Sequence, residues 1–282
     1  MMRLEAGNDM GLLTNLSLFS GAGGLDLGAK LVGGFRTVAY CEFASYAQNV
    51  LMSRIKDGGL DDAPIWNDVS TFDGKPWLGL VDVISEGFPC QDLSIAGKRG
   101  GVKKGNRSGL WFEYARIVRE VGPRFVFVEN VSGLLLGGAL GIVLGELAEM
   151  GFDAEWIMFP AGAVGAPHLR ERVFLLAYAR GIVGPNTSAE LGFIGKKVEW
   201  AKQNFGSKNW EQPEMGPWRD LSPTQLQEIS KCSEPPLLRM DDGVAKRMDD
   251  IKGELKCCGN GVVPQQAVPG WERIKDLAGG IK

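Results

Sequence analysis

The stretch NLSLFSGAGGLDLGAK, residues 15–30, joins a strand pattern to a helix pattern through a cluster of glycines. Alternating apolar residues predict a strand at Asn15–Phe19, and the spacing after the glycines predicts a helix at Gly24–Leu31. Between them, Gly21 and Gly23 have no Cβ, so they allow a tight turn whose backbone N–H groups can approach a ligand. A strand, a tight turn and a helix in this order predict the start of an α/β fold.

The same alternation continues to about residue 180. Short apolar runs predict further strands at Arg36–Cys41, Val81–Ser85, Phe125–Val128, Ala154–Phe159 and Val173–Tyr178. Amphipathic segments predict helices at Ala44–Ile55, Gly109–Val121 and Gly137–Met150. This order predicts a parallel sheet covered by helices on both faces, with ligands bound beyond the carboxyl ends of the strands.

Composition and texture divide the chain into regions. The 282 residues, 44% of them hydrophobic, can bury a full core, and no apolar run reaches the ~20 residues that cross a bilayer. We therefore expect neither export nor membrane insertion. From residue 180 to about 256 the alternation lapses into a Gly, Pro and Asn-rich segment, which predicts an irregular second lobe after a main domain at 1–179. The segment 257–282, which begins CCGNGVVPQQAV, resembles the first 179 residues in its pattern, so we expect it to return to the main domain.

Cysteine and histidine usage argues against a structural metal. The five cysteines form no C-x-x-C pair, which suits a reducing cytosol, and His168 is the only histidine in the chain. We expect no zinc site and no other bound metal.

Glu42, Phe43 and Asp68 each follow a predicted strand, and together they suggest an adenosine ligand. A dinucleotide fingerprint fails, because Asp26 stands where G-x-G-x-x-G needs its last glycine. Glu42 follows the second strand, where a carboxylate can hold two ribose hydroxyls, and Phe43 can stack on an adenine. Asp68 follows a further short strand and can accept a hydrogen bond from an exocyclic amine. Each alone is more often a turn or a surface acid, but together they favour an adenosine site.

A cysteine stands at the end of the strand in VDVISEGFPCQDLSIAG, residues 81–97. Gly87 and Pro89 place Cys90 on a turn rather than in a packed core, where a structural cysteine is normally found. The thiolate is the reactive form, and nearby positive charge increases its fraction. A nucleophilic role and a plain turn residue both stay open at this point.

Basic residues gather directly after this cysteine, although the net charge of the chain is −3. A solvated loop is the ordinary interpretation of such a run, but its place after Cys90 favours a part in the site. The residues are Lys98, Arg99, Lys103, Lys104 and Arg107.

Two further motifs carry acid and base groups. In RFVFVENV the strand delivers Glu129 and Asn130 to the edge that Cys90 occupies, if the two strands are neighbours. A carboxyl at a strand end with apolar residues behind it can act as a proton donor, although a capping or loop acid is the alternative. In HLRERVF, Arg170 and Arg172 alternate at a strand entrance and suit a carboxylate or a base carbonyl.

The order of these motifs resembles the DNA (cytosine-5) methyltransferase family, in its compact bacterial or phage form. The matching pieces are FSGAGGLDLG, CEF, NDVS, GFPCQ, ENV, RERVF and GNGVVP. They cover about residues 14–180 and 257–270, and the Pro-Cys-Gln, Glu-Asn-Val and Arg-Glu-Arg motifs in sequence are specific.

The resemblance implies both a fold and a reaction. The fold is α/β, of the class I S-adenosylmethionine-dependent methyltransferase type, Rossmann-like, with a mostly parallel sheet between two helix layers plus a small target-recognition lobe at 180–256. The reaction transfers a methyl group from S-adenosyl-L-methionine to C5 of a cytosine flipped out of double-stranded DNA. Cys90 would add to C6 while Glu129 protonates N3, and Arg172 and Arg170 would hold the base carbonyl.

The resemblance also implies the binding residues. The backbone of Phe88 and Pro89 would face the base amino group. Cofactor-binding positions would be Phe19, Gly21, Gly23, Leu25, Glu42, Phe43, Asp68, Phe88 and Asn260. DNA-binding positions would be Gln91, Ser94, Lys98, Arg99, Lys103, Lys104 and Arg107, in a lid that closes over the flipped base.

Partners and rival functions complete these expectations. The resemblance implies a monomeric cytoplasmic enzyme of a bacterial or phage-infected cell, with a cognate restriction nuclease as a candidate partner. His168 replaces a glutamine common in the family, and the arginine-rich motif usual before GNGVVP, which bears on the orientation of the small lobe, is not recognisable. Alternatives are an RNA cytosine-5 methyltransferase, against which the missing Cys-Phe-Thr motif counts, a silent DNA-binding relative, and a nicotinamide oxidoreductase.

Overall fold

The structure, a computed structural model, describes residues 11–88, 109–135, 138–166, 168–182 and 260–279. Its strands are β1 (Leu13–Leu18), β2 (Phe35–Cys41), β3 (Ile65–Trp66), β4 (Val83–Glu86), β5 (Phe125–Val131), β6 (Phe152–Pro160) and β7 (Glu171–Ala179). Its α-helices are α1 (Gly24–Val32), α2 (Ser45–Lys56), α4 (Gly109–Val121), α5 (Ala139–Glu149) and α9 (Pro264–Gly279). Short 3-10 helices are η1 (Val69–Thr71), η2 (Lys75–Trp77), η4 (Ser132–Leu135) and η5 (Ala161–Val164).

The described strands form one sheet in the order β3-β2-β1-β4-β5-β7-β6. The first five in this order run parallel, whereas β7 runs antiparallel to both β5 and β6. The prediction of a mostly parallel sheet is confirmed, and the simpler expectation of a parallel sheet throughout is wrong at β7. Parallel neighbours need a long crossover, usually a helix, but only η5 and a short loop separate β6 from β7.

The reversed direction of β7 moves its first residues to the functional edge. The carboxyl ends of β1, β4 and β5 lie at one edge of the sheet, and an antiparallel neighbour begins where they end. In the register, Phe174 pairs with Glu129 and Arg172 pairs with Val131. The arginines expected at a strand entrance therefore lie beside residues expected at strand ends.

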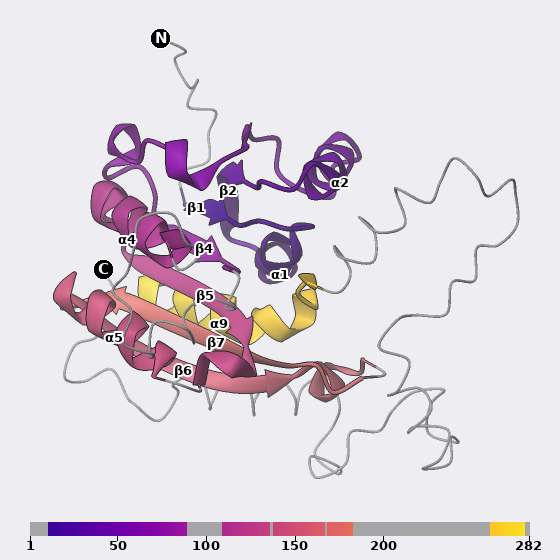
Figure 1. Ribbon diagram of the computed structural model, residues 1–282. Coiled ribbons are helices and arrows are strands. Elements are labelled where there is room, and N and C mark those ends of the chain that lie inside the picture. Colours follow the sequence, from indigo (N-terminus) through magenta and orange to yellow (C-terminus); the bar gives the residue numbers. More distant parts are fainter. Residues whose placement is uncertain (1–10, 89–108, 136–137, 167, 183–259, 280–282) are drawn as a thin grey trace, which may run out of the picture.

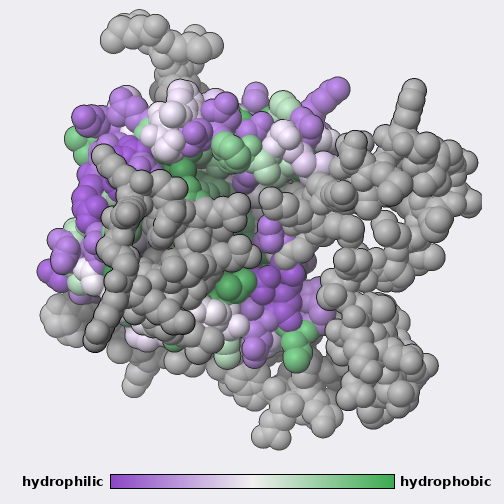
Figure 2. Space-filling view, viewed as in Figure 1, coloured by the Kyte–Doolittle hydropathy of each residue, from purple (hydrophilic) through white to green (hydrophobic). Residues whose placement is uncertain are grey.

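Helices cover both faces of the sheet, as the sequence predicts (Figure 1). On one face, α4 and α5 bury an aliphatic and aromatic cluster that includes Trp111, Tyr114 and Leu147. On the other face, α1 and α9 bury a second cluster around Trp271. Figure 2 shows hydrophilic residues along the upper and left edges of the face in view, with some hydrophobic residues between them.

Helix α9 returns late in the sequence to pack against α1. The indole of Trp271 is fully buried, meets the rings of Phe35 and Phe127 edge-on at 4.8 and 5.2 Å, and donates to the Leu25 carbonyl at 2.9 Å. A side chain on Gly24 would have no room, because an added Cβ would lie 2.6 Å from the Val262 carbonyl oxygen. The glycine-rich turn thus has residues 262–279 as its immediate neighbour.

The predicted elements are present, with ends that move by a few residues. Most of the predicted second lobe lies outside the described residues, so the division into a main domain and a recognition lobe stays a prediction. Among the residues that the structure describes, we find no helix that is both long enough and apolar enough to span a membrane.

Candidate active site

The glycine-rich turn between β1 and α1 forms one wall of a pocket. Gly21 and Gly23 have φ values of 56° and 79°, a left-handed region that glycine adopts without strain, and Phe19 reaches φ 51° despite its side chain. Phe19, Gly21 and Leu25 line the pocket, whereas Gly23 does not. An added Cβ on Gly23 would lie 2.7 Å from a methyl of Leu60, so that glycine serves the packing of the turn.

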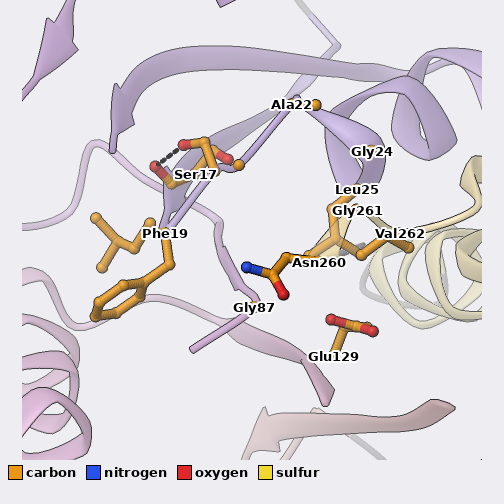
Figure 3. A pocket seen from close by; sticks show the side chains of 13 residues that line it. Ser17, Phe19, Ala22, Gly24, Leu25, Gly87, Glu129, Asn260, Gly261 and Val262 are labelled. Carbon is orange, nitrogen blue, oxygen red and sulfur yellow. Dashed lines mark hydrogen bonds between the residues drawn. The ribbon is translucent and has the colours of Figure 1, made fainter. Parts of the chain in front are cut away.

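The pocket spans about 350 Å³, counting the part that opens to solvent. Figure 3 shows Asn260, Gly261 and Val262 across it from Ser17 and Phe19, with Gly87 and Glu129 along its lower side. The pocket therefore joins the β1–α1 turn, the ends of β4 and β5, and the segment that leads into α9. Of the positions expected to bind a cofactor, Phe19, Gly21, Leu25 and Asn260 lie in this lining.

A buried acid next to the turn, Asp26, links α1 to the neighbouring strands. Asp26 is 3% exposed, and its carboxylate accepts hydrogen bonds from Ser17 Oγ, Thr37 Oγ1 and Asn15 Nδ2 at 2.9, 2.9 and 3.2 Å. Burial raises the pKa of Asp26 to about 6, although the hydrogen bonds from Ser17 and Thr37 act in the opposite direction. The sequence showed Asp26 only as a break in a dinucleotide motif, yet it ties α1 to β1 and β2.

Glu42 lies beside the same turn. Its two carboxylate oxygens accept from the backbone N–H groups of Gly21 at 2.8 Å and Ala44 at 2.7 Å. Each oxygen retains a second lone pair, so the group can still accept from a ligand hydroxyl. The next residue, Phe43, is 81% exposed and leaves its ring available for stacking.

Asp68 occupies the N-cap of η1. Its Oδ1 accepts from the backbone N–H of Ser70 at 2.9 Å and from the Ser70 hydroxyl at 2.7 Å. This is the turn role that the sequence left open as the alternative to binding an amine. Glu42, Phe43 and Asp68 are not in the described lining of the pocket, so their part in binding stays a prediction.

Glu129 and Arg172 form the most buried ion pair at this edge. Nε of Arg172 lies 2.9 Å from Oε1 of Glu129, and the side chains are only 13% and 7% exposed. Among the residues that the structure describes, none has a donor aimed at Oε1 closely enough for a hydrogen bond, so the contact is an ion pair. Burial raises the pKa of Glu129 to about 7, while the charges of Arg172 and Arg170 lower it. The carboxyl can therefore hold or release a proton near neutral pH.

Arg170 enters β7 in a conformation that side chains rarely adopt, with φ 36°. Its guanidinium donates to the backbone carbonyl of Gly261, in the segment that leads into α9. The structure thus brings Arg170, Arg172 and Glu129 together with the chain next to Asn260.

The strand end before Cys90 is held by an amide. Asn130 Nδ2 donates to the Phe88 carbonyl at 2.9 Å, and its Oδ1 accepts from the Val131 N–H at 2.8 Å. The Phe88 ring is buried and lies 5.4 Å from that of Trp111, so it points into the core rather than into the pocket. The sequence predicted Asn130 at this edge but not its hydrogen bond to the Phe88 carbonyl, because that bond depends on the pairing of β4 with β5.

Glu86, the last residue of β4, is fully buried, and neither carboxylate oxygen has a hydrogen-bond partner within the described part of the chain. Burial raises the pKa of Glu86 well above its ordinary value, because the charged carboxylate loses its hydration there.

Several expected site residues lie outside the described residues. They are Cys90, Gln91, Ser94, Lys98, Arg99, Lys103, Lys104 and Arg107. In the parts of the chain that the structure covers, no group of three His, Cys, Asp or Glu side chains is placed to hold a metal ion.

Similarity to known proteins bears on this geometry. The type II methyltransferase M.CviJI of Paramecium bursaria Chlorella virus IL3A is 36% identical over 163 residues, 57% of this chain and 42% of that protein. M.Eco47II of Escherichia coli is 36% identical over 172 residues, 58% of this chain and 39% of that protein. The chain therefore matches less than half the length of either curated relative.

Solved structures share the fold at low sequence identity. The methyltransferase EhMeth of Entamoeba histolytica superposes with a TM-score of 0.59 at 16% identity, covering 94% of this chain and 98% of that one. A DNMT2 mutant of Spodoptera frugiperda gives a TM-score of 0.52 at 20% identity, covering 63% and 53%. A family model described as C-5 cytosine-specific DNA methylase matches residues 13–233. Since that match takes in the glycine-rich turn, Glu129 and both arginines, the chain belongs to the C-5 cytosine-specific DNA methylase family.

Proposed function

We propose that this protein transfers a methyl group from S-adenosyl-L-methionine to C5 of a cytosine in double-stranded DNA, through a covalent bond between Cys90 and C6 of the base. The observation that carries the proposal is the Glu129–Arg172 pair at the rim of a pocket whose opposite wall is the glycine-rich turn. This arrangement supports the proposal, because Glu129 could give a proton to the base and Arg172 could bind its carbonyl next to a methyl donor held in the pocket.

Chain geometry supports Cys90 as the nucleophile. Glu86 pairs with Val128, so β4 ends at the edge where Glu129 begins, and an added Cβ on Gly87 would lie 3.2 Å from Glu129 Oε2. Cys90 follows Gly87 by three residues, which limits the distance between their Cα atoms to about 11 Å. A thiol within that reach can meet a base that Glu129 protonates.

Features in and beside the pocket support S-adenosyl-L-methionine as the ligand. The turn is free of Cβ atoms at Gly21, Glu42 offers carboxylate oxygens beside it, and Asn260 offers an amide at the far wall. Glu42 would hold the ribose, the Phe43 ring the adenine, Asp68 the exocyclic amine, and Asn260 the methionine end. When bound, the group supplies an electrophilic methyl on its sulfonium.

The protein side chains would then carry the remaining chemistry. The Cys90 thiolate adds to C6 while Glu129 gives its proton to N3, which makes C5 nucleophilic. Arg172, with Arg170, holds the base carbonyl and keeps Glu129 in place. After methyl transfer a base removes the C5 proton, the electrons of that C–H bond form the C5–C6 double bond and expel Cys90 as a thiolate, and N3 returns its proton to Glu129.

DNA recognition belongs to the same proposal. C5 is inaccessible in a stacked duplex, so the cytosine must be flipped out at a cost of a few kcal/mol. Gln91, Ser94 and the basic run that ends at Arg107 would bind the DNA, with the phosphates on the lysines and arginines. The lobe at 180–256 would read the sequence, and the protein would act as a monomer in the cytoplasm.

The test is incubation with tritiated S-adenosyl-L-methionine and either duplex DNA or tRNA. We expect label in DNA, recovered as 5-methylcytosine after hydrolysis, and a rate of labelling roughly 10²–10⁴-fold lower with Glu129→Gln. Label only in tRNA would replace the DNA proposal by RNA cytosine methylation. Label in neither, with cofactor binding intact by calorimetry, would leave a silent binding protein and refute the activity.

A further inference from the structure

Gln266 links the segment after the predicted lobe to the arginine entrance of β7. Its side chain is fully buried in the first turn of α9, and Nε2 donates to the Phe159 carbonyl at 2.7 Å and to the Arg170 carbonyl at 3.0 Å. Both amide hydrogens are thus used, one at the end of β6 and one at the start of β7. The amide spans the loop that reverses the chain between these strands.

The orientation of this amide follows from its partners. Exchanging its oxygen and nitrogen would place Oε1 against two carbonyl oxygens, which is repulsive. In the present orientation Oε1 has no hydrogen-bond partner among the described residues. The two donated bonds therefore fix the position of the side chain.

Arg170 needs such a fixed partner. Its φ of 36° is costly for a residue with a side chain and persists only where the surroundings impose it. Gln266 holds the carbonyl of this residue, and the Gly261 carbonyl holds its guanidinium. The backbone and the side chain of Arg170 are therefore both hydrogen-bonded to the segment 261–266.

From these contacts we propose that Gln266 is a positioning residue for the reaction: by holding the strained carbonyl of Arg170, it keeps that guanidinium directed toward the Glu129 site. The effect of Gln266 on catalysis rests on the proposed function. The positioning of Arg170 by Gln266 does not, because it is a property of the protein without substrate. An ordinary core amide that merely ties α9 to the sheet is the competing explanation, and the two differ in what they predict for Glu129.

The charges around Glu129 make that difference measurable. The described groups that act on its pKa are Arg172 and Arg170, both at the β7 entrance. The other walls contribute Gly87 from the end of β4, Leu25 from α1 and Asn260 before α9, none of which ionises. If Gln266 positions Arg170, replacing Gln266 allows the Arg170 guanidinium to move away from Glu129. Because that charge lowers the pKa of Glu129, the pKa then rises.

The experiment compares Gln266→Met with two controls on the same helix. Gln265→Met changes the exposed neighbouring glutamine, and Arg273→Met removes a different buried contact of α9, the 2.9 Å ion pair with Glu155. The carboxyl carbons of ¹³C-glutamate-labelled protein are titrated by NMR, and the Glu129 signal is assigned by its loss in Glu129→Gln. No substrate or cofactor is needed.

We expect the Glu129 midpoint to rise by roughly 0.5–1 pH unit in Gln266→Met and to stay at its wild-type value in both controls. An unchanged midpoint in Gln266→Met, or an equal rise in Arg273→Met, overturns the inference. If Gln266→Met does not fold, Gln266→Asn, whose amide is one methylene too short for both carbonyls, is judged by the same criterion.

Activity assays separate this inference from the proposed function. With wild-type transfer established, Gln266→Met should move the alkaline limb of the kcat profile upward together with the NMR midpoint. A wild type that transfers no methyl group refutes the proposed function, and the titration still decides whether Gln266 positions Arg170.

Discussion

Arg172 and Glu129 meet because β7 runs against β5. Their atoms Nε and Oε1 lie 2.9 Å apart, and the pairing of Arg172 with Val131 places the guanidinium just beyond the residue that it contacts. A parallel β7 would begin at the opposite edge of the sheet, far from the pocket. The direction of one strand thus decides whether the acid has a cationic partner.

Glu129 should control the pH dependence of methyl transfer. Its pKa is raised to about 7, and the protonated form is the donor to N3, so kcat should fall as the pH rises through about 7. Glu129→Gln should lose roughly 10²–10⁴-fold in kcat because an amide is a far weaker acid. Steady-state rates on either side of neutrality check this, and an unchanged alkaline limb in the variant would assign the titration to another group.

Arg172 should act on Glu129 through its charge and on the base through its shape. Arg172→Met removes the larger lowering charge, so the alkaline limb should move upward while kcat falls. Arg172→Lys keeps the charge but loses the planar fork, so its limb should stay near that of the wild type with kcat still reduced. Identical pH profiles for the two variants would contradict this division of roles.

Cys90→Ser should abolish methyl transfer and leave cofactor binding intact, because a serine hydroxyl at neutral pH is a much weaker nucleophile than a thiolate. Wild-type enzyme with DNA that carries 5-fluorocytosine should form a covalent complex, since fluorine cannot leave as the C5 proton does. Mass spectrometry after incubation with cofactor detects it. An unmodified mass with a verified substrate would count against covalent catalysis.

Asp26 should make stability fall as the pH rises. Its pKa is about 6 in the folded protein against 3.8 in the unfolded chain, so its favourable contribution is complete below 3.8 and is lost as the pH rises through 6. The swing is on the order of 2–3 kcal/mol at most. Asp26→Asn should flatten the dependence of the unfolding free energy on pH across this window, measured by urea denaturation. A slope equal to that of the wild type would mean that another acid, such as Glu86, dominates.

Gly24→Ala should destabilise the protein by about 1–3 kcal/mol and weaken cofactor binding, because the new methyl would press on the Val262 carbonyl. Gly145 in α5 offers the matched control, since an added Cβ there meets nothing within 4 Å. Gly145→Ala should be neutral or stabilising by up to about 1 kcal/mol. Thermal unfolding and calorimetric titration measure both, and equal effects would disprove the steric explanation.

Local patterns in the sequence account for much of this site. The glycine-rich turn and Glu129 follow from strand periodicity, which marks where each strand ends. The apolar residues before Glu129 allowed for a proton donor at this position, and burial raises the pKa of Glu129 to about 7. The antiparallel direction of β7 could have been predicted from the sequence, because the segment after β6 is too short to contain a crossover helix.

Long-range contacts could not be obtained in the same way. Nothing near Asp26 indicates that Asn15, Ser17 and Thr37 converge on it, because that depends on the pairing of β1 with β2. Gln266 and Arg170 are far apart in sequence, and a single glutamine carries no periodicity that would link them. The roles assigned to Cys90 and to the basic run remain predictions.

The packing of α9 beside α1 also matters while the chain is being made. During translation the glycine-rich turn leaves the ribosome before its neighbour Val262 and before Trp271, whose indole donates to the Leu25 carbonyl. A nascent polypeptide therefore lacks a finished pocket until synthesis has passed α9, and fragments released before that point should be unable to retain the methyl donor.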